Sequence, residues 1–146
     1  MQLCTFKLAN DFFGVDVAKV QEVIRHQDLT RIPLANREIR GLINLRGQIV
    51  TAVDLRLLLG MGEFSPEDEP MNIIVRDEDS AVSFQVDEIG DVLEVSNTEF
   101  ERPPETLKGI ARELILGAYK LEDRLLLELD AVKTVAQILE KNPTNE

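Results

Sequence analysis

Short apolar runs separated by polar turn residues recur along the chain, a pattern typical of β-strands. Apolar and polar positions alternate over residues 3–8, and the turn Asn10-Asp11 leads into a second run at 13–17. Residues 20–25 are compatible with a strand or with a turn of helix, and the periodicity leaves both open. The other predicted strands span residues 29–32, 72–76, 81–87, 92–95, 115–121 and 125–129.

The clearest β-hairpin lies in the first half of the chain. Residues 42–45 and 49–53 are apolar and rich in β-branched side chains, so both arms are expected to be largely buried. Between them lie Arg46 and Gly47, and glycine adopts the positive φ that a tight turn requires. Asp54 then ends the second arm and is a suitable N-cap for a short apolar helix.

Two other segments complete the predicted organisation. Residues 60–70 contain glycines, prolines and four acidic residues, which is typical of an exposed loop or linker. Near the C-terminus, Asp130 precedes a predicted helix over residues 131–141, whose apolar positions form one stripe. We therefore expect a mainly β protein with short helices and a C-terminal helix.

The two halves of the chain resemble each other. Gly41 precedes Asp54 by the same number of residues as Gly117 precedes Asp130. The segment Phe13-Gly14-Val15-Asp16 is echoed by Phe84-Gln85-Val86-Asp87. Similarly, Val20-Gln21-Glu22-Val23 is echoed by Val92-Leu93-Glu94-Val95, with one extra residue in between. This repeat predicts two lobes of the same topology, each a small closed sheet.

The expected organisation is one domain over residues 1–146. The first lobe is expected over approximately 15–70 and the second over approximately 71–130, with the N- and C-terminal segments exchanged between lobes. A lobe of about 60 residues is marginally stable alone, so the two lobes are expected to share apolar surface.

Positions that differ between the two repeats are candidates for function, because shared positions serve the fold. The first repeat has Asn44-Leu45-Arg46-Gly47 where the second has Lys120-Leu121-Glu122-Asp123. The comparison therefore singles out Asn44, Arg46 and Gly47 as candidate binding residues.

Composition narrows the classes of partner. The net charge of −11 and the absence of a basic stripe argue against nucleic acid and against anionic membrane surfaces. No apolar run approaches the ~18 residues of a membrane span, and the first residues lack the features of a signal peptide. Cys4 is the only cysteine, so an intramolecular disulfide is impossible and a reducing, cytoplasmic location is expected.

Catalytic constellations are not evident in the sequence. The single His26 lies in a polar segment, and Cys4 lies in an alternating strand, where a structural thiol is the simpler interpretation. The sequence has no metal-ligand pattern and no phosphate-binding loop, so neither a metal nor a cofactor is predicted. A binding protein is favoured, and a small acidic enzyme is the alternative from a different class.

The central stretch also carries a family resemblance. Gly-Leu-Ile-Asn-Leu-Arg-Gly-x-Ile-Val-x-x-Val-Asp-Leu-Arg, starting at Gly41, resembles the signature of the CheW-like coupling proteins of bacterial chemotaxis. The similarity extends over roughly residues 4–139 and includes Lys19-Val20-Gln21-Glu22-Val23 and Arg31-Ile32-Pro33. It implies two SH3-like, five-stranded β-barrels and a non-catalytic scaffold in two-component signal transduction.

The resemblance also implies partners and residues. The expected partners are the regulatory domain of a chemotaxis histidine kinase and the cytoplasmic tip of methyl-accepting chemoreceptors, in arrays attached to the membrane. Val20 matches a receptor-contact position, and Glu22 and Arg46 match residues important for coupling. A purely structural role is the alternative for each residue: a core position for Val20, and a solvated surface ion pair for Glu22 and Arg46. An adaptor role in another motility or kinase pathway is the alternative function.

Overall fold

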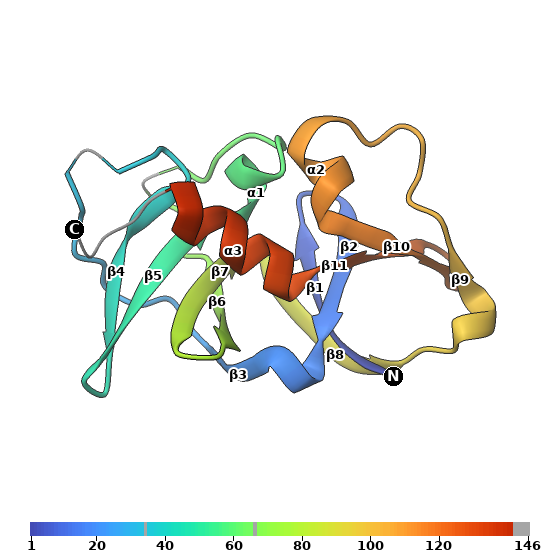
Figure 1. Cartoon of the computed structure of the whole chain (residues 1–146), viewed down its shortest axis with the longest axis horizontal. Helices are drawn as coiled ribbons and strands as arrows, with labels where there is room; N and C mark the ends of the chain where they lie inside the picture. The colour runs from blue at the N-terminus through green and yellow to red at the C-terminus, as the bar shows by residue number, and fades with distance from the viewer. Residues whose placement is uncertain (34, 66, 142–146) are drawn as a thin grey trace.

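The strands form two sheets that lie side by side (Figure 1). This computed structural model describes residues 1–33, 35–65 and 67–141. The sheet of lobe one contains β3 (Val20–Ile24), β4 (Ile39–Leu45), β5 (Gln48–Asp54), β6 (Met71–Asp77) and β7 (Ser80–Val86), in the order β3-β6-β7-β5-β4. The sheet of lobe two contains β1 (Gln2–Leu8), β2 (Asp11–Asp16), β8 (Glu88–Glu94), β9 (Phe100–Glu101), β10 (Ile115–Lys120) and β11 (Leu125–Leu129), in the order β8-β1-β2-β11-β10-β9.

Three α-helices occur in the described residues. They are α1 (Leu55–Leu58), α2 (Gly109–Leu114) and α3 (Ala131–Lys141). Two short 3₁₀ turns, Val17–Lys19 and Asn97–Glu99, lead into β3 and β9. The mainly β fold with two lobes, short helices and a C-terminal helix is therefore confirmed, whereas α2 was not predicted.

Three details differ from the predicted strands. Lobe two has six strands instead of five, because the two-residue strand β9 pairs with β10 at its edge. The predicted strand over residues 29–32 is reduced to one bridge, in which Thr30 and Leu42 exchange backbone hydrogen bonds of 2.9 and 2.7 Å. In residues 20–25, for which a strand and a helical turn were both open, Val20–Ile24 form β3.

The division of the chain between the lobes also differs from the expected boundary at residue 70. Strands β6 and β7 were expected in the second lobe, but they lie in the middle of the sheet of lobe one. Lobe two instead combines β1 and β2 with strands from residue 88 onward. The reason is long-range pairing: β5 runs parallel to β7, and β11 runs parallel to β2.

The sheets are related by an exchange of hairpins. Each repeat consists of a first hairpin, a crossing strand and a second hairpin: β1–β2, β3 and β4–β5, then β6–β7, β8 and β10–β11. In both cases the first hairpin pairs with the crossing strand and second hairpin of the other repeat. Neither repeat therefore forms a complete sheet from its own strands.

The second hairpins of the two repeats correspond without a gap. The backbone N–H of Asp54 donates to Glu38 O, and the N–H of Asp130 donates to Leu114 O, both at 2.8 Å. Both hairpins have an irregularity just before their glycine, between Ile39 and Gly41 in one and between residues 115 and 117 in the other. Conserved geometry on this scale shows that the two hairpins are built alike.

The first hairpins correspond with a register that differs from the sequence match. In the parallel ladders Thr51 lies opposite Val82, and its counterpart Leu127 lies opposite Phe13. Phe13 therefore corresponds to Val82 and not to Phe84, as the sequence match suggested. Because side chains on a strand alternate with a period of two, a two-residue shift keeps every apolar side chain on the same face. The hydrophobic pattern alone therefore could not reveal this two-residue shift in register.

A common core joins the two lobes. It contains buried side chains from both sheets, including Phe6 and Val15 from lobe two and Ile73 and Phe84 from lobe one. Helix α3 lies across the junction of the sheets in Figure 1 and adds Ile138 to this core. Each lobe has only a small separate cluster besides, so most of the apolar burial depends on the presence of both lobes.

Asp87 alone connects β7 to β8, and it is held from both lobes. Its backbone N–H donates to Lys7 O at 3.0 Å, and its carboxylate accepts from the backbone N–H of Ala9. Arg56 of α1 donates to the same carboxylate from Nε at 2.9 Å and from Nη2 at 2.6 Å. This bidentate pair is largely shielded from solvent, so the crossing point between the lobes is tightly fixed.

Candidate interaction surface at the β4–β5 hairpin

The turn between β4 and β5 is a two-residue turn with a defined backbone. Arg46 and Gly47 have φ values of 53° and 88°, as a type I′ turn requires, and Leu45 and Gln48 pair on either side. The Asn44 side-chain oxygen Oδ1 accepts a hydrogen bond of 2.9 Å from the Gly47 N–H. Asn44 and Gly47 thus build the turn, and Arg46 is presented at its tip with a 68% exposed side chain.

The Arg46 guanidinium is paired with Glu22 of β3. Arg46 Nη2 donates to Glu22 Oε2, and Gln21 Nε2 donates to the same oxygen at 3.0 Å. The hydrogen bond from Arg46, followed by that from Gln21, lowers the pKa of Glu22 below its usual value. Two of the residues implied by the resemblance, far apart in sequence, are therefore in direct contact.

Gln21 extends this pair into a network. Its Nε2 also lies 3.3 Å from Gln48 Oε1, and its Oε1 accepts a hydrogen bond of 3.0 Å from Arg76 Nε. We call Gln21, Glu22, Arg46, Gln48 and Arg76 the Arg46 network. Sequence reasoning missed Gln21, Gln48 and Arg76, because no pattern along the chain indicates that their side chains meet.

Val20 lies beside this network but has different surroundings. It is half-buried, pairs with Val75 of β6 and packs against the common core. This packing agrees with the alternative that Val20 is a core residue. A role of Val20 in receptor contact stays a prediction.

Two exposed apolar side chains lie on the same lobe. Ile49 is 58% exposed and Val23 is 37% exposed. Ile49 pairs with Asn44, which is also exposed, so the end of the hairpin extends beyond the core. The expectation that both arms are largely buried is therefore wrong near the tip. Ile49 follows Gln48 of the Arg46 network directly in β5, so one exposed apolar side chain lies next to the network in the sequence.

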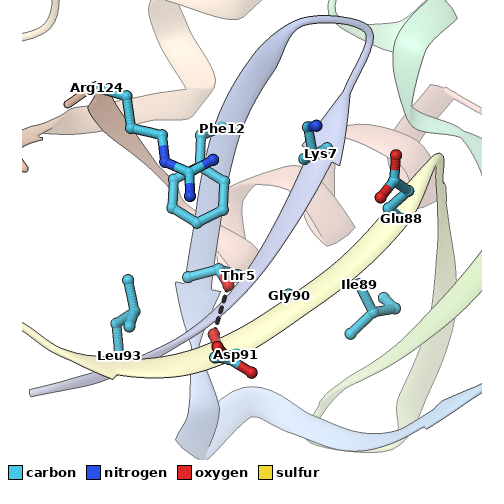
Figure 2. Close-up of a pocket in the computed structure, with 9 residues that line it drawn as sticks. All are labelled: Thr5, Lys7, Phe12, Glu88, Ile89, Gly90, Asp91, Leu93 and Arg124. Atoms are coloured by element: carbon cyan, nitrogen blue, oxygen red, sulfur yellow. Dashed lines mark hydrogen bonds between the residues drawn. The ribbon is translucent and has the colours of Figure 1, made fainter.

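The corresponding place in lobe two is a hollow of about 300 Å³ (Figure 2). Val20 pairs with Val75 and Ile89 pairs with Phe6, so the strand pairing matches Gln21 with Gly90 and not with Leu93, as the sequence match suggested. A Cβ atom at Gly90 would lie only 2.6 Å from Thr5 Oγ1. The Thr5 hydroxyl donates to Asp91 O. Arg124, which corresponds to Gln48, lies over the Phe12 ring at 4.0 Å. The two lobes thus share a backbone arrangement here but present different side chains.

The other described residues were searched for catalytic and metal-binding groups. Cys4 is buried, and burial raises the pKa of its thiol, which keeps the thiol protonated. Residues 1–33, 35–65 and 67–141 contain no group of three side chains that could hold a metal ion. None of the helices in these residues has the length and apolar character needed to cross a membrane.

Comparison with known proteins decides the family. A family model described as the CheW-like domain matches residues 2–139. The chain belongs to the CheW-like family. The chemotaxis protein CheW of Bacillus subtilis is 33% identical over 130 residues, which cover 89% of this chain and 83% of that protein. The CheW of Treponema pallidum is 32% identical over 136 residues, covering 90% and 80%.

A solved structure agrees with this assignment. The scaffolding protein TtCheW from Thermoanaerobacter tengcongensis matches with a TM-score of 0.77 and 28% identity, covering 88% of this chain and 87% of that one. The CheW-like chain is thus a chemotaxis coupling scaffold, as the resemblance implied.

Proposed function

We propose that this CheW-like chain couples chemoreceptors to a chemotaxis histidine kinase and catalyses no reaction itself. Its partners would be the regulatory domain of the kinase and the cytoplasmic tip of methyl-accepting receptors. The chain would then act in the cytoplasm, recruited to receptor arrays attached to the membrane. Neither a cofactor nor nucleic acid takes part.

The observation that carries this proposal is the Arg46 network beside exposed Ile49. The network places an exposed guanidinium at the turn of the β4–β5 hairpin and pairs it with a carboxylate on β3. An ion pair with an exposed guanidinium contributes little to stability. A pair with such a small effect on folding, supported by further polar side chains, is better explained by recognition of a partner. Charges at an interface mainly set specificity and association rate.

The test is calorimetric titration of the full chain with the kinase regulatory domain from the same genome, alongside a receptor-coupled kinase assay. Arg46→Glu should fold normally but weaken binding by about tenfold or more and abolish kinase activation. It replaces the pair with two adjacent carboxylates without touching the core. The matched control is Glu122→Arg, at the corresponding position of lobe two, which should bind like the wild type.

A second variant separates pairing from direct contact. The double variant Arg46→Glu/Glu22→Arg restores an ion pair with reversed positions. Recovery of binding would mean that the pair shapes the hairpin, and no recovery would mean that the partner reads the charges themselves. Normal coupling by Arg46→Glu would contradict the proposed role of the network. Absence of kinase binding by a folded wild-type chain would favour an adaptor role in another pathway.

A further inference from the structure

A second cavity lies in lobe one, at the end of β4 opposite to the Arg46 turn. Its volume is about 400 Å³, and it opens between the segment before β4 and the loop after α1. Three arginines line it: Arg31, Arg37 and Arg40. Because Arg40 and Arg46 lie at opposite ends of β4, this cavity is separate from the Arg46 network.

Arg40 has an unusual environment in this cavity. Its Nη1 atom is buried and has no hydrogen-bond partner among the described residues. Its guanidinium carbon lies 5.6 Å from the centre of the Phe64 ring, which Arg56 also covers at 4.7 Å. Arg56 is satisfied by Asp87, whereas Arg40 Nη1 is not. A buried guanidinium donor without an acceptor costs free energy, so this site favours an external acceptor.

The carboxylates of the cavity do not fill this need. Asp54 accepts from the backbone N–H of Leu57 at 3.0 Å and from that of Phe64 at 2.9 Å, and it makes no hydrogen bond to Arg40 Nη1. Glu63 accepts from Arg37 Nη2 at 2.9 Å. Asp28 also lines the cavity but is exposed. Arg40, which lines the cavity, therefore keeps one guanidinium nitrogen without an acceptor among the described residues.

We propose that this cavity binds a small oxyanion through Arg40, with Arg31 completing the site. The flat, five-donor guanidinium matches the oxygens of a carboxylate or a phosphate group. In lobe two the position of Arg40 is occupied by Leu116, which is 47% exposed, so the site is a property of lobe one only. The inference is independent of the proposed coupling function, because none of its residues belongs to the Arg46 network.

The experiment is a nuclear magnetic resonance titration of the full-length chain, in which arginine Nε–Hε and backbone amide signals are followed. Inorganic phosphate and succinate are added in separate series, with chloride adjusted to hold ionic strength constant. The expected result is a saturable shift confined to Arg40, Phe64 and their neighbours. Saturation by one anion and not the other identifies the source as phosphate or carboxylate, and saturation by both supports a general oxyanion site.

Variants make the result specific. Arg40→Gln should weaken binding about tenfold, because it removes a charge-assisted hydrogen bond. Arg40→Lys keeps the charge and the aliphatic stem, so it should fold even where Arg40→Gln does not, and it should still bind more weakly. Asp28→Asn removes a repelling charge and should strengthen binding about threefold. Thr30 pairs with Leu42, and Glu101 pairs with Ala118, the counterpart of Leu42, so Arg102 in lobe two corresponds to Arg31. The control is therefore Arg102→Gln, which should bind like the wild type.

The outcomes that overturn the proposal are equally definite. Shifts that stay linear for both anions would show only general salt effects, and the site would not exist. Saturation that is undiminished in Arg40→Lys would show that the guanidinium geometry is not used. Saturation with shifts centred away from Arg40 would place the anion elsewhere on the protein.

Discussion

The β4–β5 and β10–β11 hairpins occupy the same place in their sheets but end in different turns. In lobe one, Arg46 and Gly47 form a turn with two positive φ angles, closed by the Asn44 side chain. In lobe two the turn contains Glu122 and Asp123, and Leu121 N donates to Arg124 O at 2.8 Å, a pair that corresponds to Leu45 and Gln48 in lobe one. The common scaffold has therefore been kept while the exposed tips have diverged.

What the two hairpins share lies at their other end. A Cβ atom at Gly41 would lie 2.6 Å from Thr30 O, and one at Gly117 would lie 2.5 Å from Glu101 O. In both lobes a neighbouring segment approaches the glycine too closely for any side chain. The difference between the two ends teaches that packing requirements preserve one end, whereas the free end can acquire a binding function.

The largest expected effect follows from dividing the repeats. A fragment of residues 1–65 contains β1–β2 without β8 and β11, and β3–β5 without β6 and β7. It should show no cooperative thermal transition by circular dichroism, because neither sheet is complete. Mixing it with the fragment 66–146 should restore a transition. Cooperative unfolding of the first fragment alone would show that a single repeat folds, against the exchange of hairpins described above.

A smaller effect on stability is expected from replacing the two aspartates that cap helices, and the loss should differ between them. Asp54 accepts from Leu57 N and Phe64 N, whereas the Asp130 carboxylate accepts from Lys133 N at 2.9 Å. Asp130→Ala should lower the free energy of unfolding by about 1 kcal/mol, the usual value of one cap. Asp54→Ala should cost about 2 kcal/mol, because it also leaves a buried N–H unpaired. Urea denaturation measures both, and equal losses would mean that the bond to Phe64 contributes nothing.

The smallest effects concern two glutamates whose pKa values shift in opposite directions. Burial raises the pKa of Glu128 above its usual 4.5. The Glu128 carboxylate accepts a hydrogen bond of 3.1 Å from the Tyr119 hydroxyl. The pKa of Tyr119 is itself raised to about 12, chiefly by burial. The folded state therefore binds the Glu128 proton more tightly than the unfolded state does. Its contribution to stability decreases as pH rises from 4.5 through the folded-state pKa. Glu128→Gln keeps an acceptor for Tyr119 and should be stabilised above that pH window.

The stability contributed by Glu22 in lobe one should depend on pH in the opposite direction. Its pKa is lowered by Arg46, so its contribution is present above the usual 4.5 and is lost as pH falls through the folded-state pKa. Glu22→Gln should therefore be slightly less stable than the wild type at neutral pH and equal to it in acid. Urea midpoints between pH 3 and 8 measure both variants. The same direction of pH dependence in the two variants would contradict the contrast between the lobes.

The parts of the fold that were predictable depend on residues with special chemical requirements. The gapless match from Gly41 to Asp54 was visible because a close backbone approach needs glycine and a helix start needs a cap. The family resemblance singled out Glu22 and Arg46, and in the structure their side chains form an ion pair. Asn44 and Gly47 were singled out by the repeat, and in the structure they build the turn that presents Arg46.

The parts that were missed depend on contacts between distant segments. The lobe boundary was wrong because sheet membership is set by the parallel pairs of β5 with β7 and of β11 with β2. Gln21, Arg76 and the exposed Ile49 were missed because each takes its role from the strands around it. The unpaired Nη1 donor of Arg40 could not be predicted for the same reason, because the sequence pattern does not indicate whether a single side-chain nitrogen is buried.

The fixation of Asp87 has a mechanical consequence. A one-residue connection between two lobes would ordinarily be a natural hinge, but here it is clamped by Arg56 from one side and by backbone groups of β1 and its turn from the other. The two lobes should consequently move together as one rigid body, so that a displacement of one lobe also displaces the other. If the chain joins a receptor array as proposed, the protein itself would set the angle between its neighbouring partners.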